Sequence, residues 1–130
     1  MRFRDLRGWT LIELLIVISL ISILATIGMV SYRNSVTAAK ESILKTDLFR
    51  LRDAIDQYYA DKGEYPASLD TLVGEGYLRK VPDDPFTRAA DWQTVPAEPT
   101  ASKPNAEPGI YDVKSASQDT ALDGSRYADW

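Results

Sequence analysis

Residues 9–30 form an apolar run that contains a single ionisable side chain, Glu13. An α-helix of about 20 apolar residues crosses the hydrocarbon core of a bilayer, so the run predicts one membrane-spanning helix. A carboxylate near the start of such a helix costs about 2 to 3 kcal/mol on insertion. An ordinary membrane anchor would therefore insert more favourably without this carboxylate. The run therefore indicates a membrane helix in which Glu13 has a function of its own.

A short basic leader precedes the apolar run, with Arg2, Arg4 and Arg7 against one acid, Asp5. By the positive-inside rule this end stays in the cytoplasm, and the C-terminal part faces outward, into the periplasm of a cell with two membranes. A plain signal anchor with an idle Glu13 at the headgroup level is an alternative that these residues leave open. A cleaved secretory signal is disfavoured because no small-residue A-x-A site follows the run.

Gly8 stands directly before the run, whose first residues read Trp-Thr-Leu-Ile-Glu from Trp9 to Glu13. This arrangement resembles the class III signal of type IV pilins and of the pseudopilins of type II secretion. The resemblance implies that a prepilin peptidase cleaves between Gly8 and Trp9, that the new amine of Trp9 is methylated, and that Glu13 becomes the fifth residue of the mature chain. The chain departs from the usual family pattern at Trp9, where Phe is common, and at Val30, where Pro is common.

Cleavage at this place would give Glu13 a partner. It would create an α-amino group at the end of an apolar helix, and an amine and a carboxylate are both charged at neutral pH. Each charge is costly alone in lipid, whereas a pair is tolerated. We therefore expect Glu13 of one subunit to meet the Trp9 amine of a neighbour and to set the axial register of helices in a filament.

Beyond the apolar run the helix is predicted to continue, with one apolar stripe, to about residue 60. The stripe follows steps of three and four residues: Val36, Ala39, Ile43, Leu44, Leu48, Leu51, Ile55 and Tyr58. The charged residues between them are expected on the solvent side: Lys40, Glu41, Lys45, Asp47, Arg50, Arg52, Asp53 and Asp56. A coiled coil is less favoured, because the stripe covers little more than three heptads. Gly28 costs about 1 kcal/mol against alanine inside a helix, and we interpret it as a local soft point, with close helix packing as the alternative.

Residues 61–130 are predicted to form a small head. Gly63 and Pro66 end the long helix, and Ser68 caps a short helix that stops at Gly74 or Gly76. Residues 91–95 and 109–114 read as two antiparallel strands around a proline-rich loop, and residues 127–130 as a short third strand that buries Trp130. The order of the Tyr65-Pro66 turn, the short helix and the Pro82 to Phe86 loop resembles the pseudopilin head. The expected fold class is thus α+β, with a long N-terminal helix packed on a small antiparallel sheet.

The polar loop at residues 115–125 suggests a metal site through the same resemblance. In major pseudopilins the corresponding loop binds calcium with carboxylates and backbone carbonyls, the oxygen ligands that this hard cation takes. The resemblance points to Asp119 and Asp123 as ligands, with Asp112 and Asp129 as helpers. The alternative is that these acids are solvated turn residues, because Asp123-Gly124 also forms an ordinary turn.

Composition excludes several functions. The chain has no Cys and no His, so disulfides, thiolate or imidazole metal sites and Ser-His or Cys-His catalysis are ruled out, and an enzyme is not expected. The net charge is −4, and the basic residues outside the leader are scattered, which does not support nucleic-acid binding. Many type IV pilins carry a Cys pair, so the lack of Cys favours a pseudopilin.

The resemblance and the residue patterns together predict a structural subunit. The expected organisation is a leader (1–8), a membrane and filament-core helix (9–30), an amphipathic continuation (31–60) and a head (61–130). The resemblance implies a homo-oligomeric helical filament of a type II secretion pseudopilus, with a prepilin peptidase, an inner-membrane assembly platform and minor pseudopilins as partners. Two alternatives remain open: a type IV pilus subunit that forms surface fibres, and a membrane-anchored binding module that does not polymerise.

Overall fold

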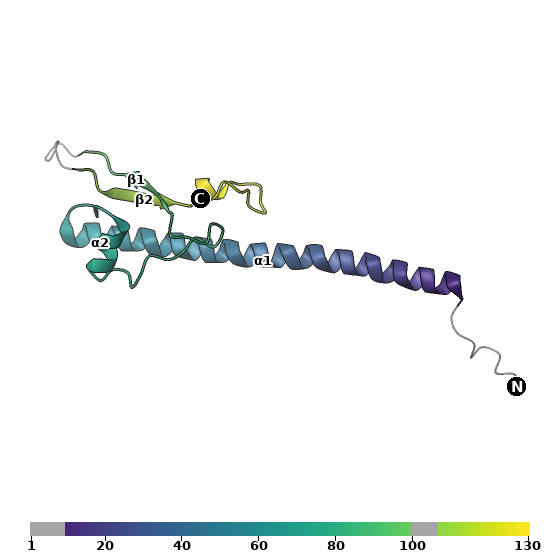
Figure 1. Cartoon of the computed structure of the whole chain (residues 1–130). Helices are drawn as coiled ribbons and strands as arrows, with labels where there is room; N and C mark the ends of the chain where they lie inside the picture. The colour runs from purple at the N-terminus through teal and green to yellow at the C-terminus, as the bar shows by residue number, and fades with distance from the viewer. Residues whose placement is uncertain (1–9, 100–106) are drawn as a thin grey trace, which may run out of the picture. The chain divides into compact units, whose positions relative to one another are not determined.

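The computed structural model describes residues 10–99 and 107–130, and the chain divides into two compact units, residues 1–36 and 37–130. In chain order the elements are α1 (Leu11–Lys62), α2 (Leu69–Gly74), β1 (Gln93–Pro96), β2 (Ile110–Lys114) and the 3-10 helix η2 (Tyr127–Asp129), as Figure 1 shows. This order of one long helix followed by a small antiparallel sheet confirms the α+β, pilin-like fold class.

The first unit holds the apolar part of α1, which is long and apolar enough to cross a membrane. Among the described residues its large side chains are exposed: Leu11 is 76% exposed and Val30 is 55% exposed. Three hydroxyl groups inside this stretch, those of Ser19, Ser22 and Thr26, donate to backbone carbonyls four residues earlier. Each hydroxyl is thus satisfied within the helix, which is what a hydrocarbon environment requires of polar groups.

The second unit buries one face of the remaining part of α1. Leu44, Leu48, Leu51, Ile55 and Tyr58 lie in the hydrophobic core, as the spacing predicts. The first part of the predicted stripe is wrong, because Val36 is 38% exposed, Ile43 is 51% exposed and Ala39 is also exposed. The physical reason is that the hydrophobic core of the described residues begins at Leu44, so the earlier apolar residues of the stripe are not part of it.

The end of α1 and the start of the short helix α2 lie where the sequence predicts them. The long helix α1 ends at Lys62, and Gly63 follows with φ +72 while its N–H donates to the Tyr59 carbonyl at 2.8 Å. A left-handed residue at this place is a common helix stop that favours glycine. Ser68 then caps α2 by accepting a hydrogen bond from the Thr71 N–H at 3.3 Å.

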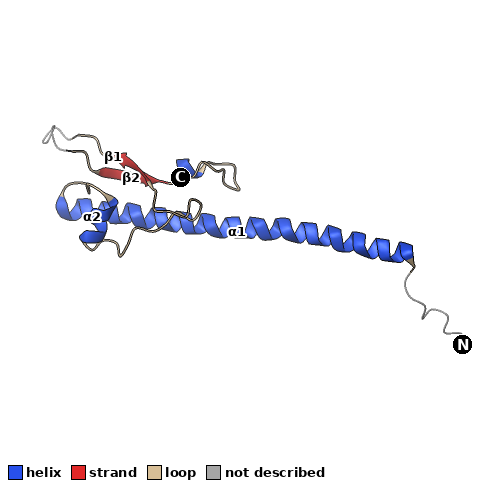
Figure 2. Ribbon diagram, viewed as in Figure 1, coloured by secondary structure: helices blue, strands red, loops and turns tan. Residues whose placement is uncertain are grey.

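The sheet has two antiparallel strands, β1 and β2, which Figure 2 colours red. Thr94 pairs with Val113 and Val95 with Asp112, and the register shifts at Pro96. The predicted strand pair is therefore confirmed, with β1 beginning two residues later than expected.

The predicted third strand at residues 127–130 is wrong, because residues 127–129 form the 3-10 helix η2. The Tyr127 ring stacks on Phe86 at 4.0 Å and meets Trp130 edge to face at 5.1 Å. The Trp130 N–H donates to the Tyr127 carbonyl at 3.2 Å, so the tight turn satisfies its backbone locally without joining the sheet. Trp130 is partly buried against the core.

Gly109 is the position where the head leaves no room for a side chain. A Cβ built on Gly109 would lie 2.5 Å from the Tyr65 carbonyl oxygen and 2.6 Å from the Tyr65 Cβ. Next to it the Ile110 N–H donates to the Pro66 carbonyl at 2.8 Å, which holds the start of β2 against the Tyr65-Pro66 turn. This close approach of two backbones is possible only with glycine.

We expect Gly109→Ala to lower the Tm of the head by about 5 °C or more, because the added methyl group must push these backbones apart at a cost of about 1 to 3 kcal/mol. The measurement is a thermal melt of the full chain in detergent micelles, followed by near-ultraviolet circular dichroism. Gly74→Ala is the matched control, since nothing lies within 4 Å of a Cβ at Gly74. Equal melting temperatures for the two variants would contradict the close approach.

Candidate functional site

Glu13 lies in the first turn of α1 and exchanges hydrogen bonds with Thr10, the residue before the helix. The backbone N–H and the hydroxyl of Thr10 each donate to Glu13 Oε2 at 3.3 Å. In return the Glu13 N–H donates to the Thr10 hydroxyl at 3.3 Å. This is a capping box, in which the N-cap residue and the third residue of the helix satisfy each other's backbone donors. The Thr-x-x-Glu spacing carries this signal, and the sequence analysis missed it.

The capping box uses one oxygen of the Glu13 carboxylate. Within the described residues, the other oxygen, Oε1, has no hydrogen-bond partner. The side chain is exposed at the N-terminal end of an apolar helix, where a negative charge is also favoured by the helix dipole. Glu13 can therefore cap its own helix and still accept a positive group from another chain.

The other residues predicted for processing and flexibility are not tested by the structure. Gly8 and Trp9, the predicted cleavage and methylation positions, lie outside the described residues. Gly28 lies within the continuous helix α1, and a Cβ there would meet nothing within 4 Å. The soft point at Gly28 stays a prediction.

Two of the four acids predicted for the calcium site, Asp123 and Asp112, have other hydrogen-bond partners. Asp123 Oδ1 accepts hydrogen bonds from the Ser125 N–H at 2.9 Å and the Ser125 hydroxyl at 2.5 Å. These bonds hold the pKa of Asp123 below its ordinary value, with Lys45 contributing in the same direction. Gly124 follows with φ +88 in the expected turn. Asp112 is paired with Arg52, its Oδ1 lying 2.7 Å from the guanidinium Nε.

This arrangement does not fit a calcium site built from the four predicted carboxylates. In the described part of the chain no three acids come together closely enough to hold a metal ion. Asp119 contributes its backbone to the local fold, since its carbonyl accepts from the Tyr127 N–H at 3.2 Å. Calcium binding at Asp119 and Asp123 stays a prediction, and a melting experiment described below tests it.

Three charged side chains of α1 reach the last residues of the chain, although the sequence analysis assigned them to solvent. Glu41 Oε1 accepts from the Leu122 N–H and from the Tyr127 hydroxyl, both at 2.8 Å. The ammonium group of Lys45 lies 4.8 Å from the centre of the Trp130 ring, and Arg52 binds the Trp130 carbonyl at 2.7 Å. Spacings of four and seven residues place Glu41, Lys45 and Arg52 on one helix face. This spacing was the sequence pattern from which their shared role could have been predicted.

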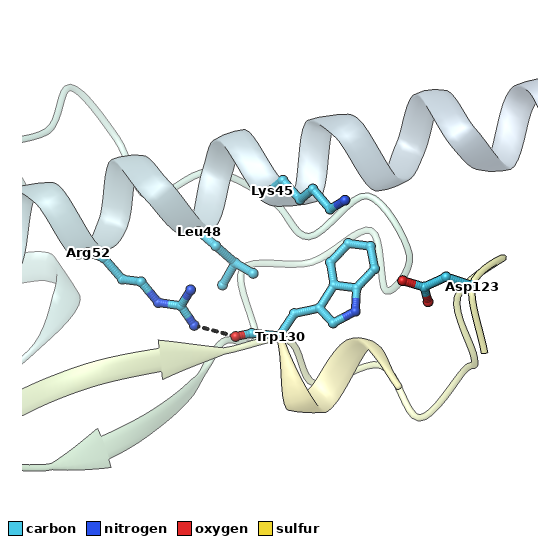
Figure 3. Close-up of a pocket in the computed structure, with 5 residues that line it drawn as sticks. All are labelled: Lys45, Leu48, Arg52, Asp123 and Trp130. Carbon is cyan, nitrogen blue, oxygen red and sulfur yellow. Dashed lines mark hydrogen bonds between the residues drawn. The ribbon is translucent and has the colours of Figure 1, made fainter. Parts of the chain in front are cut away.

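Lys45, Arg52 and Trp130 also line an open pocket of about 220 Å³, together with Leu48 and Asp123. Figure 3 shows Lys45 over the Trp130 ring and the hydrogen bond from Arg52 to Trp130. The Trp130 indole N–H donates to the Ser125 hydroxyl at 2.7 Å, which joins the ring to the Asp123 turn. Burial and the bond to Glu41 raise the pKa of Tyr127, so its hydroxyl stays a donor at neutral pH.

A second feature that the sequence analysis missed is the buried acid of the Pro82 to Phe86 loop. Asp84 is fully buried and accepts hydrogen bonds from the Phe86 N–H at 2.8 Å and from the Ser115 hydroxyl. Its backbone N–H donates to the Ala89 carbonyl at 2.9 Å. The loop is therefore organised around an acid and fixes the Phe86 ring that packs on Tyr127.

Asp47 of α1 is also buried, with 7% of its surface exposed, which corrects its predicted place on the solvent side. Burial raises the pKa of Asp47 above its ordinary value of 3.8, Arg50 opposes this shift and Asp84 adds to it. A raised pKa in the folded state means that the contribution of Asp47 to stability is fully present below its unfolded pKa. That contribution is lost as the pH rises through the folded pKa.

We expect Asp47→Asn to raise the Tm relative to the wild-type chain at about pH 7, with a difference that shrinks as the pH falls toward about 4. The reason is that asparagine removes the burial of a charge, which exists only while Asp47 is ionised. Melts of the full chain in detergent micelles across this pH range measure the difference. Asp53→Asn, at an exposed position of the same helix, is the control. A difference independent of pH would contradict the assignment.

The chain matches known proteins over most of its length. A family model described as the prokaryotic N-terminal methylation motif matches residues 5–29. Type II secretion system core protein G of Klebsiella michiganensis is 27% identical over 135 residues, which cover 92% of this chain and 88% of that protein. Core protein G of Pseudomonas aeruginosa is 30% identical over 102 residues, which cover 66% of this chain and 72% of that protein.

A shorter match links the chain to a fimbrial protein. EcpC of Eikenella corrodens is 42% identical over 65 residues, which cover 47% of this chain and 40% of that protein. No solved structure matches the chain significantly. The apolar helix α1 and the matches to core protein G fit a protein anchored in the inner membrane. The chain belongs to the family of type II secretion system core protein G, the G-type pseudopilins.

Proposed function

We propose that this chain is the structural subunit of a type II secretion pseudopilus. A prepilin peptidase cleaves it after Gly8, and the Trp9 amine is then methylated. The subunit is stored in the inner membrane as a single-pass protein with its head in the periplasm, and it is polymerised into a helical filament that serves protein export. The role is structural, and the partners are further copies of the chain, the peptidase, an inner-membrane assembly platform and minor pseudopilins.

The observation that carries this proposal is an apolar helix with an acid at its start and with its large side chains exposed in the part of the chain that the structure describes. Leu11, Ile12 and Leu24 of α1 are each more than two-thirds exposed in the single chain. Such a surface is stable only in lipid or against other apolar helices, so both storage in a membrane and packing in a filament core satisfy it. The methylation motif matched at residues 5–29 supports processing of the same segment.

Orientation and register support the same proposal. Arg2, Arg4 and Arg7 favour a cytoplasmic leader, which leaves the head on the periplasmic side. The second oxygen of Glu13 has no partner among the described residues, so it can accept the amine of a processed neighbour. This pairing would remove two isolated charges from an apolar environment at each subunit added.

A type IV pilus subunit is the second candidate, and the match to the fimbrial protein of Eikenella corrodens favours it. Deleting the gene separates the two functions. The pseudopilus proposal expects proteins exported by type II secretion to accumulate in the periplasm, while fibres in the sheared cell-surface fraction are unchanged. Normal export with loss of surface fibres would instead establish a pilus subunit. Normal export and normal fibres would leave a membrane-anchored binding module.

A further inference from the structure

The C-terminal segment, residues 115–130, is held to α1 by charged side chains of the helix. Glu41 binds the Leu122 N–H and the Tyr127 hydroxyl, and Lys45 lies over the Trp130 ring. Regular secondary structure in this segment is limited to η2 and one isolated bridge between Thr120 and Arg126. The C-terminal segment is therefore positioned by polar contacts with α1 and not by pairing in a sheet.

Arg52 joins three parts of the head through one guanidinium group. Its Nε donates to Asp112 Oδ1 at 2.7 Å, and one terminal nitrogen donates to the Val113 carbonyl at 3.1 Å and to the Trp130 carbonyl at 2.7 Å. Asp112 and Val113 belong to β2, whereas Trp130 follows η2. Figure 3 shows the bond from Arg52 to Trp130. The helix, the sheet and the C-terminal segment thus meet at this side chain.

The atoms around Arg52 are oxygens of the kinds that a hard cation takes: Asp112 Oδ1, the Val113 carbonyl oxygen and the main-chain oxygen of Trp130. Calcium in proteins is bound by the same kinds of oxygen. A guanidinium can replace a metal ion here, because it carries a permanent positive charge and presents several donors in a fixed plane. One oxygen of the Asp123 carboxylate, Oδ1, meanwhile accepts both hydrogen bonds from Ser125.

We infer that Arg52 is the structural cation of this head and fixes the C-terminal segment to α1 and β2, so that the head folds without bound calcium. The inference concerns the head of a single chain and does not depend on filament assembly. It places Asp112 as the carboxylate partner of Arg52. It also accounts for the finding that no three acids among the described residues come together to hold a metal ion.

Thermal melts of the full chain in detergent micelles test this inference, with either calcium chloride or a chelator added. Calcium chloride is used at about 5 mM, a concentration that saturates weak extracellular calcium sites. We expect the wild-type Tm to be the same under both conditions and Arg52→Met to lower it under both. Arg79→Met is the control, because Arg79 is an exposed arginine of the same head. A rise of the wild-type Tm with calcium, or equal melting of the Arg52 and Arg79 variants, would overturn the inference.

Tryptic cleavage after Arg126 provides a second readout at a temperature well below the melt. Arg126 is exposed and lies just before η2, and intact-mass measurement detects the loss of the residues that follow it. Release of the C-terminal segment in Arg52→Met is expected to speed this cleavage about tenfold relative to Arg79→Met. Arg52→Lys, which keeps the charge but has one nitrogen for three oxygens, replaces Arg52→Met if that variant does not fold. Cleavage at the control rate in the folded variant would contradict the role of Arg52.

Discussion

Replacing Glu13 with glutamine is expected to stop filament assembly while leaving the start of α1 intact. Glutamine can still accept the Thr10 hydrogen bonds of the capping box, but it carries no charge for the amine of a neighbouring subunit. An unpaired ammonium group in an apolar environment costs about 2.5 to 3.5 kcal/mol, which corresponds to a roughly 100-fold weaker addition of each subunit. Sedimentation of filaments from cells that overproduce the chain measures this loss.

Thr10→Ala is the matched control, because it removes the capping hydroxyl and keeps the Glu13 charge. We expect this variant to assemble almost as well as the wild-type chain, since losing a helix cap costs about 1 kcal/mol. Both variants must first be found cleaved, so that assembly and processing are distinguished. Normal filaments from Glu13→Gln, together with few filaments from Thr10→Ala, would mean that Glu13 is a helix cap only.

Asp84→Ala is expected to destabilise the head by about 3 to 5 kcal/mol. Asp84 is fully buried and accepts from the Phe86 N–H and the Ser115 hydroxyl. Alanine leaves both donors buried without an acceptor and releases the loop that places Phe86 on Tyr127. Thermal or urea unfolding of the full chain in detergent micelles measures the change in the free energy of unfolding.

The neighbouring acid provides the control for this substitution. Asp83 has the same side chain but is exposed, so Asp83→Ala is expected to change the free energy of unfolding by less than about 0.5 kcal/mol. Similar losses for the two variants would show that the net charge of the loop matters, and the buried hydrogen bonds would not be the cause.

The parts of the fold that could be predicted are those decided by neighbouring residues. Gly63 ends α1 and Ser68 caps α2 because a left-handed stop and a serine cap need only the local backbone. The apolar stripe was correct from Leu44 to Tyr58, where the head covers it. It failed at Val36 because helix periodicity does not tell how far along a helix its partner extends.

The parts that could not be predicted depend on contacts between distant residues. The Arg52 guanidinium meets Asp112 and Trp130, which lie 60 and 78 residues further along the chain. The third strand failed because the stacking of Tyr127 on Phe86 favours a tight turn over extended backbone. The capping box of Thr10 and Glu13 is different, since its spacing was present in the sequence, but Glu13 was interpreted only as a membrane charge and as the partner of a neighbouring amine.

The most direct test of the proposed function is the intact mass and N-terminal sequence of the chain, isolated from native membranes and from assembled filaments. We expect a chain that begins at a methylated Trp9 in both fractions, because cleavage after Gly8 creates the amine that Glu13 of a neighbour would bind. A chain that still begins at Met1 in cells with an active prepilin peptidase would contradict processing, and with it the pairing at Glu13 and the filament.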